Sequence, residues 1–114
     1  MNVTINIDGK DYAILFLKRK YQKNDNLAIQ VYSKIEEQDR WEPWCNLTVN
    51  LHGQTLDRNK AFLDTNNCSE EIIDWLLENG HANIIGKAQS GYCNYSLAEF
   101  SESFINDYLV DIAL

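Results

Sequence analysis

The chain has 114 residues, and its 17 acidic and 10 basic side chains give a net charge of −7. Domains of this size are common, so we expect a single domain over residues 1–114. Hydrophobic residues make up 45% of the chain, which is enough to bury a core and argues against disorder. The negative charge disfavours a generic nucleic-acid binder, because such proteins use basic surfaces to displace counterions from phosphate.

The start of the chain does not read as a targeting signal. It has no basic region followed by a long apolar stretch, and the longest apolar run, Tyr12 to Leu17, is far below the about 20 residues that cross a bilayer. Cys45, Cys68 and Cys93 are an odd number of cysteines in unrelated contexts, which favours reduced thiols over a disulfide framework. We therefore expect a cytoplasmic protein.

The first half of the chain predicts four strands. Residues 3–7 alternate apolar and polar side chains, and Asp8-Gly9 after them is typical of a tight hairpin turn. The return segment 12–17 is apolar at both its odd and its even positions, which predicts an interior strand with both faces covered. Residues 27–33 alternate again. The clearest alternation spans residues 45–52, where we expect Cys45, Leu47, Val49 and Leu51 to face inward and Asn46, Thr48, Asn50 and His52 outward.

In the second half of the chain, the spacing of apolar residues changes from the alternation of strands to the period of a helix. Ser69 is a good N-cap for a helix that ends at Asn79-Gly80, and residues 82–88 and 92–95 predict two short strands. A second amphipathic helix is expected after Ser101, with apolar positions at Phe104, Ile105, Tyr108, Leu109 and Ile112. The pattern as a whole predicts an α+β fold: a mainly antiparallel sheet of four to six strands with one or two amphipathic helices packed on it.

The charge is concentrated in the second half. Residues 1–60 hold nine basic and eight acidic side chains, for a net +1, whereas residues 61–114 hold one basic and nine acidic side chains, for a net −8. Glu70, Asp74 and Glu78 have i, i+4, i+8 spacing and share one helix face. The nine acidic residues that we take as a candidate partner-binding set are Asp64, Glu70, Glu71, Asp74, Glu78, Glu99, Glu102, Asp107 and Asp111. Two interpretations stay open: ordinary solvated helix faces, or a surface that docks on a basic partner by mimicking nucleic acid.

Other features carry weaker signals. Trp41 and Trp44 are either interface anchors or packing residues of their loop, and the basic run from Lys18 to Lys23 is either a phosphate contact or an ordinary wet loop. The cysteines and histidines lack the short spacings of zinc sites, and no glycine-rich phosphate loop is present in the sequence. We therefore expect no enzymatic activity, no cofactor and no bound metal.

Two blocks of the sequence are distinctive: Phe62-Leu63-Asp64-Thr65-Asn66-Asn67 and Ser90-Gly91-Tyr92-Cys93-Asn94-Tyr95. With the residues around them, over about residues 46–100, they resemble a small bacterial domain family of unknown function that is carried on conjugative and other mobile elements. Ser96 stands where a proline is expected after the second block. The resemblance implies a genomic setting and no catalytic residues.

The charge and the implied setting together predict a non-enzymatic protein-binding module that inhibits a host defence complex, of the CRISPR or restriction type, through its acidic half. The expected partner is a basic protein surface, for instance on a nuclease or a CRISPR effector, with no membrane and no direct nucleic-acid binding. Two alternatives remain: a conjugation or replication accessory protein that contacts DNA through residues 18–23, and a solvated domain with an unrelated protein partner.

Overall fold

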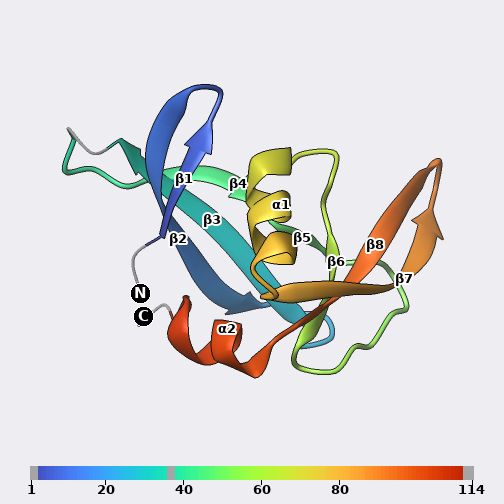
Figure 1. Cartoon of the computed structure of the whole chain (residues 1–114). Coiled ribbons are helices and arrows are strands. Elements are labelled where there is room, and N and C mark those ends of the chain that lie inside the picture. Colours follow the sequence, from blue (N-terminus) through green and yellow to red (C-terminus); the bar gives the residue numbers. More distant parts are fainter. Residues whose placement is uncertain (1–2, 36–37, 112–114) are drawn as a thin grey trace.

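The computed structural model describes residues 3–35 and 38–111, which form two sheets and two helices (Figure 1). The first sheet contains β1 (Val3–Ile7), β2 (Lys10–Lys20), β3 (Leu27–Ile35) and β4 (Glu42–Asn46) in that order, with β9 (Leu109–Asp111) also paired to β2. The second sheet has the order β5 (Thr48–Val49), β6 (Lys60–Leu63), β8 (Cys93–Phe100) and β7 (Ala82–Ser90). The helices are α1 (Glu70–Glu78) and α2 (Glu102–Asp107). The α+β class is confirmed, and its mostly antiparallel strands are divided between two sheets.

The hairpin predicted at the start of the chain is confirmed, and the conformation of its turn explains why it forms. Asp8 and Gly9 both take positive φ, at 51° and 85°, and Asn6 Oδ1 accepts a hydrogen bond from the Gly9 N–H at 3.2 Å. Two successive positive φ values match the right-handed twist of the strands that flank them.

The strand over residues 12–17 lies inside the first sheet, as expected, but only one of its faces is fully packed. β2 pairs with β3 along one edge and with β1 and β9 along the other. Ile14 and Phe16 are buried in the core, and on the opposite face Leu17 is buried while Ala13 and Leu15 are half-buried. Both faces of this strand are therefore covered, but the face opposite the core is covered less completely than expected.

The single strand predicted over residues 45–52 is wrong, because the chain crosses there from one sheet to the other. β4 ends at Asn46 and β5 begins at Thr48, with Leu47 fully buried between them. Thr48, which we expected to face outward, is buried: its Oγ1 accepts a hydrogen bond from the Ile29 N–H at 3.1 Å and bonds to the Tyr21 hydroxyl at 2.9 Å. The Ile29 N–H needs an acceptor where the chain passes between the sheets, and Thr48 provides it. Thr48 therefore faces inward, against the alternation of inward and outward side chains that the sequence predicts.

The sequence predicted a single sheet, so the second sheet was not expected. β6 was not predicted, and β7 and β8 are both longer than the segments 82–88 and 92–95. Gly86 sits at a register shift in the β7–β8 pairing, and Gly91 takes a positive φ in the turn between these strands. The two glycines therefore bend and connect the hairpin without ending its strands early.

Helix α1 packs its apolar face against the core and ends where the sequence predicts. Ile72, Ile73 and Leu76 are buried, and the helix contacts β1 of the first sheet and β7 of the second (Figure 1). At its end the His81 N–H donates to the Leu76 carbonyl and the Gly80 N–H donates to the Leu77 carbonyl. This is the Schellman pattern, for which Gly80 supplies the positive φ of 70°.

The second helix is shorter than its apolar spacing suggests. Ser101 caps α2 by accepting a hydrogen bond from the Phe104 N–H at 3.1 Å, but the helix ends at Asp107. Leu109, expected in this helix, instead starts β9, which pairs in parallel with β2 opposite Phe16. Ile112 lies outside the described residues. In the part of the chain that the structure describes, no helix has the length and hydropathy needed to span a membrane.

Candidate functional site

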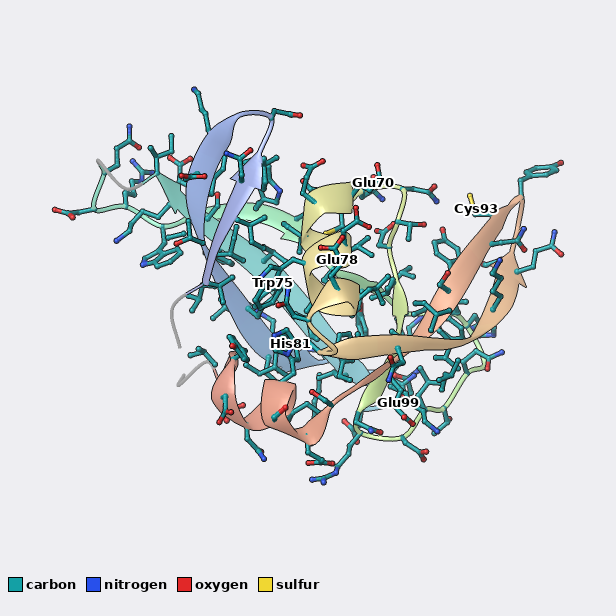
Figure 2. All side chains as sticks on the ribbon, viewed as in Figure 1. Glu70, Trp75, Glu78, His81, Cys93 and Glu99 are labelled. Carbon is teal, nitrogen blue, oxygen red and sulfur yellow. The ribbon has the colours of Figure 1, made fainter. Side chains whose placement is uncertain are left out.

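Three carboxylates form a row along the exposed face of α1. Glu70, Asp74 and Glu78 are all exposed, and Figure 2 labels Glu70 and Glu78 on the first and last residues of the helix. Among residues 3–35 and 38–111, no basic group lies within ion-pair distance of any of the three. We call these three residues the α1 row.

The α1 row does not stabilise its own helix as a whole. Carboxylates four residues apart repel each other by a few tenths of a kcal/mol per pair. Glu70 and Glu71 lie in the first turn, where negative charge is favourable, but Glu78 lies in the last turn, which holds no basic residue. Glu78 therefore opposes the helix dipole, and helix stability does not account for the row.

The structure does not bring all nine acidic candidates to one surface. Glu99 is on the face of the second sheet opposite to Ala98 and Phe100, which belong to the core, and it lies 3.9 Å from Lys60 Nζ. Glu102, at the start of α2, pairs with Arg58 at 3.0 Å. These two carboxylates already have basic partners within the protein.

The remaining acidic candidates have diverse positions. Both Asp64 carboxylate oxygens accept hydrogen bonds from Asn67 Nδ2, at 3.2 and 3.0 Å, so Asp64 holds the turn that precedes α1. Glu71 is half-buried on α1, Asp107 is the last residue of α2, and Asp111 lies opposite Lys18 in the pairing of β9 with β2. The α1 row is therefore the compact part of the predicted set.

The two tryptophans are partly exposed and partly engaged by neighbours. Trp41 is 39% exposed, with Lys34 Nζ 5.2 Å above its ring. Trp44 is 37% exposed, lies 5.2 Å from the Tyr12 ring and donates from Nε1 to Ser69 Oγ at 2.8 Å. The Trp44 contact occupies the hydroxyl of Ser69, which holds the N-cap position of α1 without making a side-chain cap bond. Trp44 therefore links β4 to the start of the acidic helix.

The basic run is divided by the strand that carries it. Lys18 and Lys20 point to one face of β2 and Arg19 to the other, because side chains alternate along a strand. Lys23 follows in the turn after the strand, and it is exposed. The four cations therefore do not form a single row along one face.

An open surface pocket of about 570 Å³ lies beside this turn and was not anticipated from the sequence. It is lined by residues 21–24 and 50–55. Asn24 and Asn26 both donate from Nδ2 to the Gln54 carbonyl, at 3.1 and 2.8 Å, and Asn26 Oδ1 accepts from the Leu56 N–H at 2.9 Å. These amides hold the loop after β5 in place.

His81 lies in a cluster of aromatic rings between α1 and α2 (Figure 2). Its ring is 4.7 Å from Trp75, 4.8 Å from Tyr108 and 5.5 Å from Phe104. Burial among these rings lowers the pKa of His81 from its usual value of 6.5. The apolar neighbours indicate a packing role for this histidine.

The lowered pKa of His81 predicts that the fold weakens in mild acid. The unfolded imidazole binds a proton more readily than the folded one, so this contribution is complete above about pH 6.5 and is lost as the pH falls below it. We expect the free energy of unfolding in urea to fall between about pH 7.5 and about pH 5.5, and the fall to be smaller in His81→Phe. His52→Phe, at an exposed position, is the matched control, and equal slopes in wild type and His81→Phe would contradict the assignment.

The expectation that the three cysteines have unrelated contexts is wrong for Cys45 and Cys68, which lie side by side. The Sγ atoms of Cys45 on β4 and Cys68 before α1 lie 3.0 Å apart in a hydrogen bond, although 23 positions separate them in the sequence. Cys93 starts β8 at the tip of the β7–β8 hairpin (Figure 2). In the described part of the chain, no group of three or more His, Cys, Asp or Glu side chains is arranged to hold a metal ion.

The comparisons with known proteins identify a family but no activity. A family model described as a domain of unknown function (DUF4313) matches residues 16–111, so the chain belongs to this family. The match extends well beyond residues 46–100 at both ends. No curated protein and no solved structure matches the chain.

Proposed function

We propose that this member of the DUF4313 family is a non-enzymatic binding module that docks on a basic protein surface through the α1 row. The observation that carries the proposal is three exposed carboxylates in line with no ion-pair partner among the described residues. The charge of Glu78 opposes the stability of its own helix. A basic partner that neutralises the three carboxylates would explain why the α1 row is present.

The charge density of the α1 row supports a partner that normally binds nucleic acid. Positions four residues apart on a helix are separated by about 6 Å along its axis, so the row spans about 12 Å. One strand of duplex DNA carries about three to four phosphates over that distance. A groove lined by lysine and arginine for a nucleic-acid backbone would therefore meet a comparable number of charges on α1.

The resemblance to proteins of mobile elements supports a more specific proposal for the partner. An element that enters a cell benefits from blocking the nucleases and CRISPR effectors that would destroy it. Blocking a nucleic-acid groove needs only complementary charge and shape and no catalytic group. The partner is then the basic groove of a host defence complex, and the protein acts as its inhibitor.

Salt-dependent capture from a bacterial lysate tests the proposal. The immobilised protein should retain a basic nucleic-acid-binding protein at about 0.1 M salt and release it at about 1 M, where the Debye length falls from about 10 Å to about 3 Å. Addition of double-stranded DNA should compete with this capture. Binding of DNA by the isolated protein would instead support contact through residues 18–23 and would contradict the proposal.

A further inference from the structure

Cys45 and Cys68 lie close enough to react with each other. Their Sγ atoms are 3.0 Å apart, and a disulfide bond is about 2.05 Å long, so an approach of about 1 Å joins them. Cys45 belongs to β4 of the first sheet, and Cys68 lies in the segment that links β6 to α1. The fold has therefore placed two thiols from distant parts of the chain in reacting position.

The two thiols differ in access and in acidity. Cys45 is half-buried and can be reached from solvent, whereas Cys68 is only 7% exposed. The hydrogen bond from Cys68 lowers the pKa of Cys45, because the Cys68 thiol can donate to the Cys45 thiolate, and the same bond raises the pKa of Cys68. Cys45 is therefore the thiol that ionises first.

The surroundings of the pair contain one stabilising and one opposing group. The backbone N–H of Ser69, at the start of α1, lowers the pKa of both thiols because it favours the thiolate. The Asp64 carboxylate opposes ionisation by charge repulsion, and burial opposes it as well. For Cys45 the hydrogen bond from Cys68, together with the Ser69 N–H, outweighs burial and the Asp64 charge, and the pKa of Cys45 is below its ordinary value.

We propose that Cys45 and Cys68 are a redox modification site that forms a reversible disulfide when hydrogen peroxide reaches Cys45. This inference rests on the distance between the sulfurs and on the solvent access of Cys45, and it stands whether or not the α1 row binds a partner.

The chemistry has two steps. The Cys45 thiolate attacks one peroxide oxygen, the O–O bond breaks, and hydroxide leaves to give a sulfenic acid on Cys45. Cys68 Sγ then attacks the Cys45 sulfur, the S–O bond breaks, and hydroxide departs with the thiol proton as water. The two thiols lose two electrons in total, and the peroxide is reduced to two molecules of water.

The disulfide would tie β4 directly to the residue before the N-cap of α1. It would act alongside the hydrogen bond from Trp44 to Ser69, which joins the same two segments. The closed loop contains about 24 residues, and a cross-link of this size raises the melting temperature of a small domain by about 10 °C. A thiol reductant returns the protein to its starting state.

Peptide mapping of the folded, full-length chain tests the proposal. After treatment with equimolar hydrogen peroxide and alkylation of the remaining thiols, we expect a peptide that links Cys45 to Cys68, with Cys93 alkylated. The melting temperature should rise by about 10 °C and return when dithiothreitol is added. Links that involve Cys93, or alkylation of both Cys45 and Cys68 after oxidation, would overturn the proposal.

Two variants separate the pair from general thiol oxidation. Cys93→Ser is the matched control and should keep both the cross-link and the rise in melting temperature. Cys45→Ser should lose both while keeping the melting temperature of the reduced wild type within a few degrees. If Cys45→Ser does not fold, the peptide map of oxidised Cys93→Ser tests the proposal alone, because that variant has only Cys45 and Cys68 left to react.

Formation of the Cys45–Cys68 disulfide only in urea would also overturn the proposal, since the folded geometry is what favours the reaction.

Discussion

Replacement of the α1 row by neutral isosteres should weaken partner binding strongly and leave the fold intact. In the variant Glu70→Gln, Asp74→Asn, Glu78→Gln, each lost charge contact is worth about 1 kcal/mol, so the affinity should fall by about two orders of magnitude. The free energy of unfolding should change by less than about 0.5 kcal/mol, because relief of repulsion along the helix and at Glu78 offsets the lost dipole interaction of Glu70. Calorimetric titration against the captured partner, with urea unfolding in parallel, measures both quantities.

A second triple variant controls for the change in net charge. Asp11→Asn, Asp25→Asn, Asp39→Asn also removes three negative charges, at exposed positions in the first half of the chain. Asn is well suited to the positive φ of 57° at Asp25. This control should bind nearly as well as wild type. Equal loss of affinity in both triple variants would mean that net charge, and not the α1 row, drives the interaction.

Phe104→Ala should cause the largest loss of stability of any change considered, about 3–5 kcal/mol. Phe104 is fully buried, and its ring lies 5.3 Å from Phe16 and 5.5 Å from Phe100. Helix α2 has only six residues, too few to be stable on its own, so this side chain holds it against the core. Urea unfolding monitored by circular dichroism gives the free energy difference.

Ile105→Ala on the same helix is the control for Phe104→Ala. Ile105 is half-buried, so Ile105→Ala should lower the free energy of unfolding by about 1–2 kcal/mol. Both variants introduce alanine, so the helix propensity of the new residue is the same in each. If Phe104→Ala does not fold, Phe104→Leu should fold with an intermediate loss. Similar losses at Phe104 and Ile105 would show that α2 is not anchored by the buried ring.

Local chemistry explains why some elements were predictable from the sequence. The Asp8-Gly9 turn, the strand alternation over residues 27–33 and the termini of α1 each depend on residues within a few positions of one another. Where the structure departs from prediction, the cause is a distant partner. Thr48 is buried because Ile29 needs an acceptor for its N–H, and Leu109 leaves the helical pattern because β2 offers a strand to pair with.

The same distinction applies to the candidate site. Spacing alone placed Glu70, Asp74 and Glu78 on one helix face, because that relation is local. It did not separate them from Glu99 and Glu102, whose basic partners come from Lys60 and from Arg58, 44 positions away from Glu102. The proximity of Cys45 to Cys68 likewise arises from the tertiary fold and has no signature in their spacing.

The pairing of β9 with β2 has a consequence for the order in which the chain folds. Phe16 and Leu109 are opposite each other although about 90 residues separate them, so this contact closes one of the longest loops in the molecule. Among the described strands, β9 alone pairs with residues 16–18 along that edge of β2, so this stretch has no such partner until β9 arrives. A nascent chain would thus expose an open strand edge during synthesis, which makes the C-terminal strand a guard against pairing with other chains.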